Sequence, residues 1–277
     1  MRHKIGIVIF AENNEQINYV DIATANAHMI KNHMNVSVSI ATSDDVIDKI
    51  FDNVIKIPKS DEQTKSFIGY GKYEKLSYYN SNRTSIYDIT PYNETIMIDA
   101  DYLILDNSLN LCWGSDEEIM MSDTATNLYG GPMNLRERRL FDTNIPMSWA
   151  TVVYFKKSER AKIFFKLVQN IQKNYAYYAG MFNIQAGLFR NDYAFSIASH
   201  LMSEAQTTNV KPLPDHVLLT STPADKIMKI RKGKIDLVSK VDEWHYPVQM
   251  KQNFHYLNKF DLSERAKDIV EEYETKN

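Results

Sequence analysis

Short apolar runs alternate with helix-like segments at the start of the chain. Residues 4–10 (KIGIVIF), 36–42 (VSVSIAT) and 54–57 are short and rich in β-branched side chains, which is typical of buried strands. Residues 15–32 place apolar side chains at helical spacing, and residues 46–51 predict a second, shorter helix. Strands that alternate with helices at this spacing indicate an α/β fold with a mainly parallel sheet and helices on both faces.

Strand and helix patterns continue to the end of the chain, apart from one stretch. Residues 61–82 are polar and rich in tyrosine, and we expect an irregular excursion there. Residues 226–241 (KIMKIRKGKIDLVSKV) predict a hairpin that turns at Lys232-Gly233 and carries a basic tip. Further helices are expected at residues 83–89, 159–178, 194–202 and 263–274, and further strands at residues 95–105, 116–121, 124–129 and 145–155.

Two carboxylates interrupt the apolar run of residues 95–105 (TIMIDADYLIL). Asp99 and Asp101 are two positions apart, so on an extended strand their side chains point to the same side. Two unpaired carboxylates beside this much apolar surface are costly to bury, and a divalent cation such as Mg²⁺ or Mn²⁺ would neutralise them. The alternative is that these residues only end a strand and cap a turn.

The ends of the predicted parallel strands define one candidate crevice. In sheets of this kind ligands bind beyond the carboxyl ends of the strands, which are residues 10–14, 43–45 and 99–101 here. The first strand is followed by Ala-Glu-Asn-Asn instead of a Gly-rich dinucleotide fingerprint, and the sequence contains no P-loop. The phosphates of a bound nucleotide would therefore be met by a metal ion and by Lys or Arg side chains.

Composition narrows the class of protein without naming a function. The chain has 277 residues, 44% of them hydrophobic and 24% charged, as in an ordinary globular protein. Its net charge of −3 gives no overall basic field that would recruit nucleic acid. The single cysteine, Cys112, fits a reducing compartment. Because no apolar run approaches transmembrane length and the N-terminus lacks a signal-peptide pattern, we expect a cytoplasmic protein.

Four landmarks follow one another along the chain. They are the N-terminal strand-helix-strand, the apolar-flanked Asp99-Ala100-Asp101, the strand 146–155 with the later Arg190-Asn191-Asp192, and the late pair His255 and Lys259. Together they resemble a nucleotide-sugar glycosyltransferase of the GT-A type. The last pair is similar to the His-x-x-x-Lys stretch of family 8-like transferases, although the Gly and Pro-Trp that usually accompany that stretch are missing here.

The resemblance implies the organisation of the whole chain. Residues 1–277 would form a single domain with a GT-A-like mixed sheet, a Rossmann-like nucleotide-binding half and flanking helices. About residues 1–106 would bind the nucleotide sugar, for which a UDP-sugar is favoured. About residues 107–260 would bind the acceptor, and about residues 261–277 would form a C-terminal helix.

The resemblance also implies roles for individual residues. Mn²⁺ or Mg²⁺ would be held by Asp99, Asp101 and His255, although His255 could instead be a surface histidine in a loop. Asp192 would deprotonate an acceptor hydroxyl or orient acceptor and sugar, whereas a helix cap is its ordinary role. The remaining contacts to the donor would come from Ala11, Glu12, Asn14 and Asp44 at the nucleoside and from Arg83, Asp99 and Lys259 at the diphosphate.

The acceptor is left open by the sequence. The composition and general character of the sequence resemble those of phage-encoded glycosyltransferases, some of which add sugars to hydroxymethylated bases of DNA. A glycan or small-molecule acceptor is the alternative. Two rival functions are a nucleotidyltransferase that makes an activated sugar and an inactive, DNA-binding accessory protein. Contacts to double-stranded DNA would come from two basic groups, which are Arg136, Arg138 and Arg139, and Arg231, Lys232 and Lys234.

Overall fold

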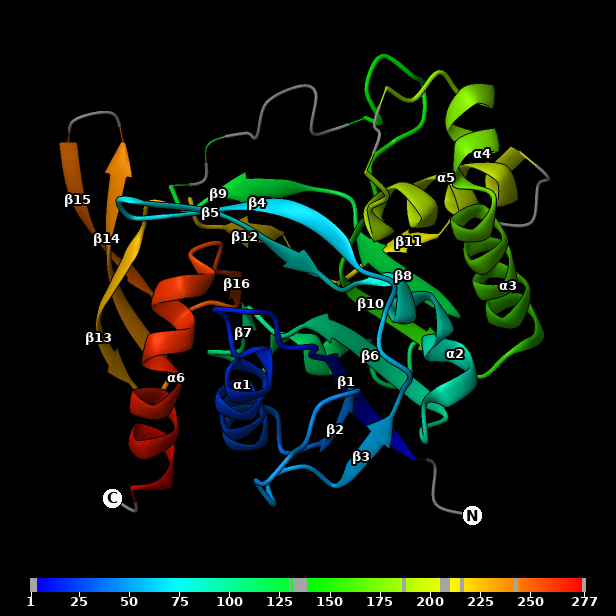
Figure 1. Ribbon diagram of the computed structural model, residues 1–277. Coiled ribbons are helices and arrows are strands. Elements are labelled where there is room, and N and C mark those ends of the chain that lie inside the picture. The colour runs from blue at the N-terminus through cyan, green and yellow to red at the C-terminus, as the bar shows by residue number, and fades with distance from the viewer. Residues whose placement is uncertain are drawn as a thin grey trace.

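The largest sheet has seven strands and carries both parallel and antiparallel pairs (Figure 1). The computed structural model describes residues 4–129, 131, 139–185, 188–204, 210–214, 217–241 and 244–275. In spatial order the strands are β11 (Lys211–Pro212), β8 (Ile119–Ser122), β10 (Trp149–Lys156), β6 (Glu94–Asp99), β1 (Ile5–Phe10), β2 (Ser37–Thr42) and β3 (Asn53–Lys56). The run β6-β1-β2-β3 is parallel, and β10 runs antiparallel to both β6 and β8. The predicted α/β fold with a mixed sheet is confirmed.

Helices cover both faces of this sheet (Figure 1). Alternation along β1 sends Ile7 and Ile9 into the core beneath α1 (Tyr19–Met34) and α6 (Lys259–Glu274). Val8 and Phe10 point the other way, into the core beneath α3 (Glu159–Lys173) and α5 (Asn191–Glu204). The short α2 (Ile86–Ile89) and α4 (Tyr175–Met181) lie beside α3. Among the residues described, no helix combines the length and apolar character needed to cross a bilayer, and the cytoplasmic location stays a prediction.

Three smaller sheets flank the main one on the side of α1 and α6. A four-stranded sheet has the order β7 (Tyr102–Leu103), β16 (Phe254–His255), β12 (Leu218–Thr220) and β9 (Ala125–Asn127). A three-stranded sheet has the order β13 (Lys226–Arg231), β14 (Lys234–Val241) and β15 (Trp244–Met250). The last is a hairpin of β4 (Gln63–Gly69) and β5 (Lys72–Tyr78), whose turn residue Tyr70 places its hydroxyl 3.4 Å from His245 Nε2 of β15.

Two predictions about secondary structure are wrong. Residues 46–51 form no helix, because the Asp48 side chain accepts a hydrogen bond from the backbone N–H of Ile50 at 2.7 Å and so supports a turn instead. Residues 61–82 are not an irregular excursion, because most of them form the β4-β5 hairpin. The hairpin closes through Tyr70 and Gly71, and Gly71 has the positive φ of 65° that favours glycine at such a turn.

Candidate functional site

The two carboxylates lie where the chain passes from one sheet to another. The predicted single strand 95–105 is in fact interrupted, since β6 ends at Asp99 and β7 begins at Tyr102 in the four-stranded sheet. The alternation of an unbroken strand is therefore not what brings the carboxylates together. A tight turn at residues 100–101 does so instead.

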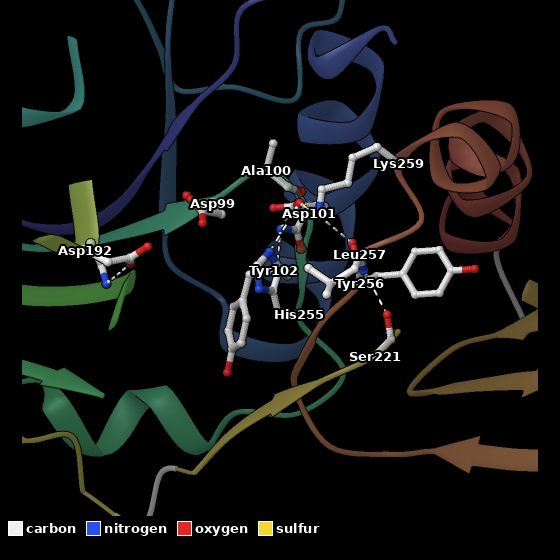
Figure 2. Close-up of polar contacts among 12 residues, drawn as sticks. Asp99, Ala100, Asp101, Tyr102, Asp192, Ser221, His255, Tyr256, Leu257 and Lys259 are labelled. Atoms are coloured by element: carbon white, nitrogen blue, oxygen red, sulfur yellow. Dashed lines mark hydrogen bonds and ion pairs between the residues drawn. The ribbon is translucent and has the colours of Figure 1, made fainter. Parts of the chain in front are cut away.

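Strand β16 brings a histidine to the same turn from more than 150 positions along the chain. His255 pairs with Tyr102 of β7, and the backbone N–H of Tyr256 donates to the carbonyl of Asp101 at 2.9 Å. One ligand atom from each of Asp99, Asp101 and His255 lies within 4.8 Å of the others. Figure 2 shows the three side chains gathered at this point, with Lys259 approaching Asp101 from the start of α6.

Asp101 is buried, with 5% of its surface exposed, and two basic groups meet it. His255 Nε2 lies 3.3 Å from Asp101 Oδ2, and Lys259 Nζ forms an ion pair with the same oxygen. Burial acts to raise the pKa of the Asp101 carboxyl, but the charges and hydrogen bonds of Lys259 and His255 outweigh it and hold this pKa well below its usual range. Asp101 is therefore ionised at neutral pH.

At Asp99 the effect of burial on the pKa is larger than that of the neighbouring positive charge. Burial raises the pKa of its carboxyl, and the nearby Arg83 guanidinium offsets this effect only in part. Arg83 Nη1 lies 2.5 Å from Asp99 Oδ1, and Arg83 Nη2 donates to the carbonyl of Ala150 on β10 at 2.5 Å. Among the described residues Arg83 Nε has no hydrogen-bond partner. The ionised form of Asp101 is thus stabilised by its neighbours, whereas the ionised form of Asp99 would be stabilised by a further positive charge.

The donor set fits a divalent cation. Donor atoms around one octahedral ion, each at about 2.0–2.1 Å, lie roughly 3–4 Å apart. The separations of up to 4.8 Å in the group of Asp99, Asp101 and His255 need only a small contraction to reach this geometry. Two carboxylates suit Mg²⁺ or Mn²⁺, and the imidazole moves the preference towards Mn²⁺.

Asp192 lines the same cavity and comes from α5, which packs on the face of the main sheet opposite α1 and α6. It is the second residue of α5, yet its carboxylate contacts β10 and a neighbouring arginine. Asp192 Oδ1 accepts from the backbone N–H of Ala150 at 2.9 Å, and Oδ2 accepts from Arg190 at 2.8 Å. Burial acts to raise the pKa of this carboxyl, but the charge of Arg190 and the hydrogen bond from Ala150 hold it below its usual range. In Figure 2 Asp192 lies on the side of Asp99 that faces away from His255.

A cavity of about 280 Å³ joins these groups. The predicted residues differ in whether they reach it. Asn14 and Asp44 are not among its lining residues: Asn14 Oδ1 accepts from the backbone N–H of Ile17 at 2.8 Å, and Asp44 Oδ2 accepts from that of Asn13 at 2.7 Å. Both thus shape the loop after β1. The predicted residues that do line the cavity are Ala11, Glu12, Arg83, Asp99, Asp101, Asp192, His255 and Lys259.

Several lining residues were not among the site residues named from the sequence. The β4-β5 hairpin and the segment after it contribute Lys65, Tyr78 and Asn80, and β10 contributes Trp149. Both polar side-chain atoms of Asn80 are buried and have no hydrogen-bond partner among the described residues, which leaves them for a ligand or water. The alternating polar and apolar residues around Tyr70-Gly71 were the available signal for this hairpin.

The basic groups assigned to DNA are placed away from the cavity or outside the described residues. Lys232 Nζ donates to the carbonyl of Thr275 at 2.6 Å, beyond the end of α6, and Arg231 forms an ion pair with Asp236. Arg139 is exposed and forms a β-bridge with Pro146. Arg136 and Arg138 lie outside the described residues. The described members of the two groups, Arg139, Arg231, Lys232 and Lys234, are not among the residues that line the cavity.

The chain shares structural similarity with solved glycosyltransferases. The sequence matches no protein-family model and no curated protein. GlyE of Streptococcus pneumoniae is 10% identical with a TM-score of 0.43, over 77% of this chain and 46% of GlyE. The galactosyltransferase LgtC, solved with donor and acceptor sugar analogs, is 10% identical with a TM-score of 0.45, over 75% and 72% of the two chains. Mouse xyloside xylosyltransferase 1 is 9% identical with a TM-score of 0.42, over 75% and 84%.

The chain spans less than half of the length of GlyE. Identities near 10% and TM-scores below 0.5 carry no conclusion about activity. Function is therefore argued from the geometry of the site alone.

Proposed function

We propose that the protein is a metal-dependent glycosyltransferase of the GT-A type, which transfers a sugar from a nucleoside-diphosphate sugar to a hydroxyl group. The observation that carries this proposal is the convergence of Asp99, Asp101 and His255, with Lys259 beside them, on a cavity at the carboxyl ends of parallel strands. Oxygen-rich sites of this kind hold hard cations that share their coordination with substrate phosphates.

The charges around the site suit a leaving diphosphate. A divalent cation bound by Asp99, Asp101 and His255 would supply Lewis-acid stabilisation of the charge that develops on the departing nucleoside diphosphate. Lys259 and Arg83 lie against the two carboxylates and would add positive charge at the same phosphates. The carboxylates thus hold these cations in place before the donor binds.

The loop after β1 would hold the nucleoside. The Glu12 carboxylate is 8% exposed, and it accepts from the backbone N–H of Ser60 at 2.8 Å and from the hydroxyl of Ser43 at 3.2 Å. These contacts fix the wall of the cavity at Ala11 and Glu12, while Asn14 supports the loop from behind. We propose that this wall contacts the base and ribose.

Asp192 suits an orienting role better than that of a general base. Both of its oxygens are already engaged, by Ala150 and by Arg190, and its pKa lies below the usual range for an aspartate. A base of such low pKa takes up a proton weakly at neutral pH. We therefore propose that Asp192 positions the acceptor or the transferred sugar through hydrogen bonds and its negative charge.

We propose a glycan or small-molecule acceptor in preference to DNA. The residues of the β13-β14 turn that were expected to grip a duplex are engaged within the protein, Arg231 with Asp236 and Lys232 with the end of α6. Cations that are already paired release less free energy on meeting phosphate than free ones. The net charge of −3 also provides no long-range attraction to DNA.

A thermal-shift screen tests the donor half of the proposal. The protein is heated with UDP, GDP, ADP, CDP or TDP, each with Mn²⁺, with Mg²⁺ and with EDTA. We expect one diphosphate to raise the Tm by several degrees only when metal is present, since a ligand at 100 times its Kd adds about 2.7 kcal/mol of stability. No metal-dependent stabilisation by any diphosphate would contradict the proposal.

Turnover separates the transferase from the nucleotidyltransferase reading. Incubation with the matching nucleoside-diphosphate sugars should release nucleoside diphosphate and give a glycosylated product by mass spectrometry. A nucleotidyltransferase would instead release pyrophosphate from a nucleoside triphosphate and a sugar phosphate. Hydroxymethylated DNA is included among the acceptors, and a sugar found on its nucleosides would overturn our preference for a glycan or small molecule.

A further inference from the structure

Strand β4 places a lysine on its inward face. Side chains alternate along the strand, so Lys65 shares a face with Phe67, which is buried, while Thr64 and Ser66 are exposed. The ammonium group lies 4.7 Å from the centre of the Tyr78 ring, and both residues line the cavity. An inward position on a hairpin is ordinarily apolar, so a cation there calls for a reason.

Lys65 differs from the other cations of the cavity because no carboxylate among the described residues forms an ion pair with it. Lys65 Nζ also has no hydrogen-bond partner in this part of the chain, and it lies over the rings of Phe67 and Tyr78. Burial, and then the charges of Lys259 and Arg190, lower the pKa of Lys65 to about 8. The other lysine and the arginines of the cavity are held in the pairs Arg83–Asp99, Arg190–Asp192 and Lys259–Asp101.

The hairpin is docked where α6 begins. A side chain at Gly69 would meet Asn258 Oδ1 at 2.9 Å and the Phe260 ring at 3.0 Å, so the backbone of β4 lies directly against this helix start. Lys72, across the turn, places its ammonium 4.0 Å from the centre of the Phe260 ring. Lys259 lies between Asn258 and Phe260 in the sequence. The packing of β4 against the start of α6 therefore brings this strand and Lys259 to the same cavity.

We propose that Lys65 binds the diphosphate of the nucleotide donor, and that the β4-β5 hairpin supplies this phosphate contact to the cavity that it lines together with Asp99 and Asp101. The inference rests on the proposed function. Lys65 is half-buried and has no carboxylate partner among the described residues, so part of its desolvation cost is uncompensated, and an anion in the cavity would relieve this cost. Lys65 would then be a donor-binding residue in addition to those implied by the resemblance to GT-A enzymes.

The test compares Lys65→Met with Lys75→Met. Lys75 lies on the same hairpin but is exposed, so its variant controls for loss of one positive charge. Affinity is measured by calorimetry with Mn²⁺ for two probes, the nucleoside diphosphate that stabilises the wild-type protein and inorganic pyrophosphate. We expect Lys65→Met to weaken binding of both probes about 10- to 100-fold, Lys65→Arg to recover part of the loss, and Lys75→Met to match wild type.

The Tm of the unliganded variants supplies an independent readout. Because Lys65 is unpaired, Lys65→Met should leave the Tm unchanged or raise it, while it weakens binding. Unchanged affinity for both probes in Lys65→Met overturns the inference alone, as does a lowered Tm that Lys65→Arg does not restore. Aggregation with unchanged affinity would indicate instead that the lysine protects a strand edge. If wild type binds neither probe, the proposed function fails and the inference fails with it.

Discussion

Two hairpins of this protein look alike in sequence and differ in what their cations contact. Both β4-β5 and β13-β14 are rich in lysine and turn at a glycine of positive φ, 65° at Gly71 and 68° at Gly233. In β13-β14, Lys232 and Arg231 are engaged with the end of α6 and with Asp236. In β4-β5, Lys65 lines the cavity and forms no ion pair with a carboxylate of the described residues.

The difference teaches that the number of cations in a hairpin does not by itself indicate a binding surface; whether they line the cavity and whether they are already paired matters more. A paired surface cation contributes little net free energy to a new contact, because its existing partner must be given up. A half-buried cation without a carboxylate partner has no such contact to give up when an anion arrives. The predictions below test whether the charge balance of the cavity controls activity while that of the distant hairpin does not.

The largest effect is expected at Asp99 and Asp101, the carboxylates that line the cavity together with Lys65. Asp101→Asn and Asp99→Asn should each abolish metal-dependent stabilisation by the diphosphate and lower kcat by at least about 10²–10³. The two variants should differ in unliganded stability. Asp101→Asn leaves the half-buried Lys259 without its ion pair, with a hydrogen bond to the carbonyl of Tyr256 remaining, and should cost about 3–5 kcal/mol. The ionised form of Asp99 is disfavoured by burial, so its loss should cost less.

Urea unfolding of both variants and steady-state kinetics check this prediction. Equal activity of Asp99→Asn and wild type would show that the cavity does not work through a metal. Equal destabilisation of the two variants would contradict the opposite pKa directions that distinguish Asp99 from Asp101.

A smaller effect is expected at Asp192. We predict that Asp192→Asn lowers kcat by about 10²-fold with little change in the affinity for the diphosphate, because its carboxylate is paired with Arg190 and Ala150 and is not one of the groups assigned to the metal or the phosphates. Kinetics with varied acceptor, together with calorimetry for the diphosphate, measure the two quantities separately. Loss of diphosphate affinity equal to the loss in kcat would show that Asp192 belongs to the donor site.

Much of the fold was predictable because its strands are short, apolar and β-branched. Strands β1 and β2 and helices α1 and α6 lie near their predicted positions, with differences of a few residues at the ends. The helix expected at residues 159–178 divides at Asn174 into α3 and α4. The local sequence pattern could not predict that the chain leaves β6 and enters β7 of another sheet, because β7 pairs with β16 from a distant part of the chain.

Some residues of the candidate site could likewise be identified from the local sequence, and others could not. Asp99 and Asp101 were visible as charges inside an apolar run, which is a local anomaly. His255 and Lys259 required a resemblance, because nothing in their own sequence neighbourhood points to the turn that they contact. Lys65 was missed because its significance lies in having no partner, and the absence of a partner is a property of the folded arrangement.

The next effect concerns the proton on Lys65. At pH 8.5, above its pKa of about 8, most Lys65 in the unliganded protein is neutral, under the influence of burial and of the neighbours Lys259 and Arg190, with Asp101 and Asp192 opposing them. A bound diphosphate favours the charged form, so binding should take up part of one proton at pH 8.5 and little at pH 6.5. Calorimetry in buffers of different ionisation enthalpy measures this uptake. Lys65→Met should lack it, and identical uptake in that variant would place the proton elsewhere.

The smallest effect is expected at the tip of β13-β14. Replacing Arg231, Lys232 and Lys234 together by alanine should change kcat/KM by no more than about two- to threefold, because these cations are not among the residues that line the cavity. Stability should fall slightly, by about 0–1 kcal/mol for each broken surface contact, as measured by urea unfolding. A large loss of transfer to hydroxymethylated DNA, with a shallower salt dependence than wild type, would return this hairpin to the acceptor site. Since Lys65→Met removes one cation and this variant removes three, a larger effect of the single change would establish that the position of a cation, and not the number of charges, separates the two hairpins.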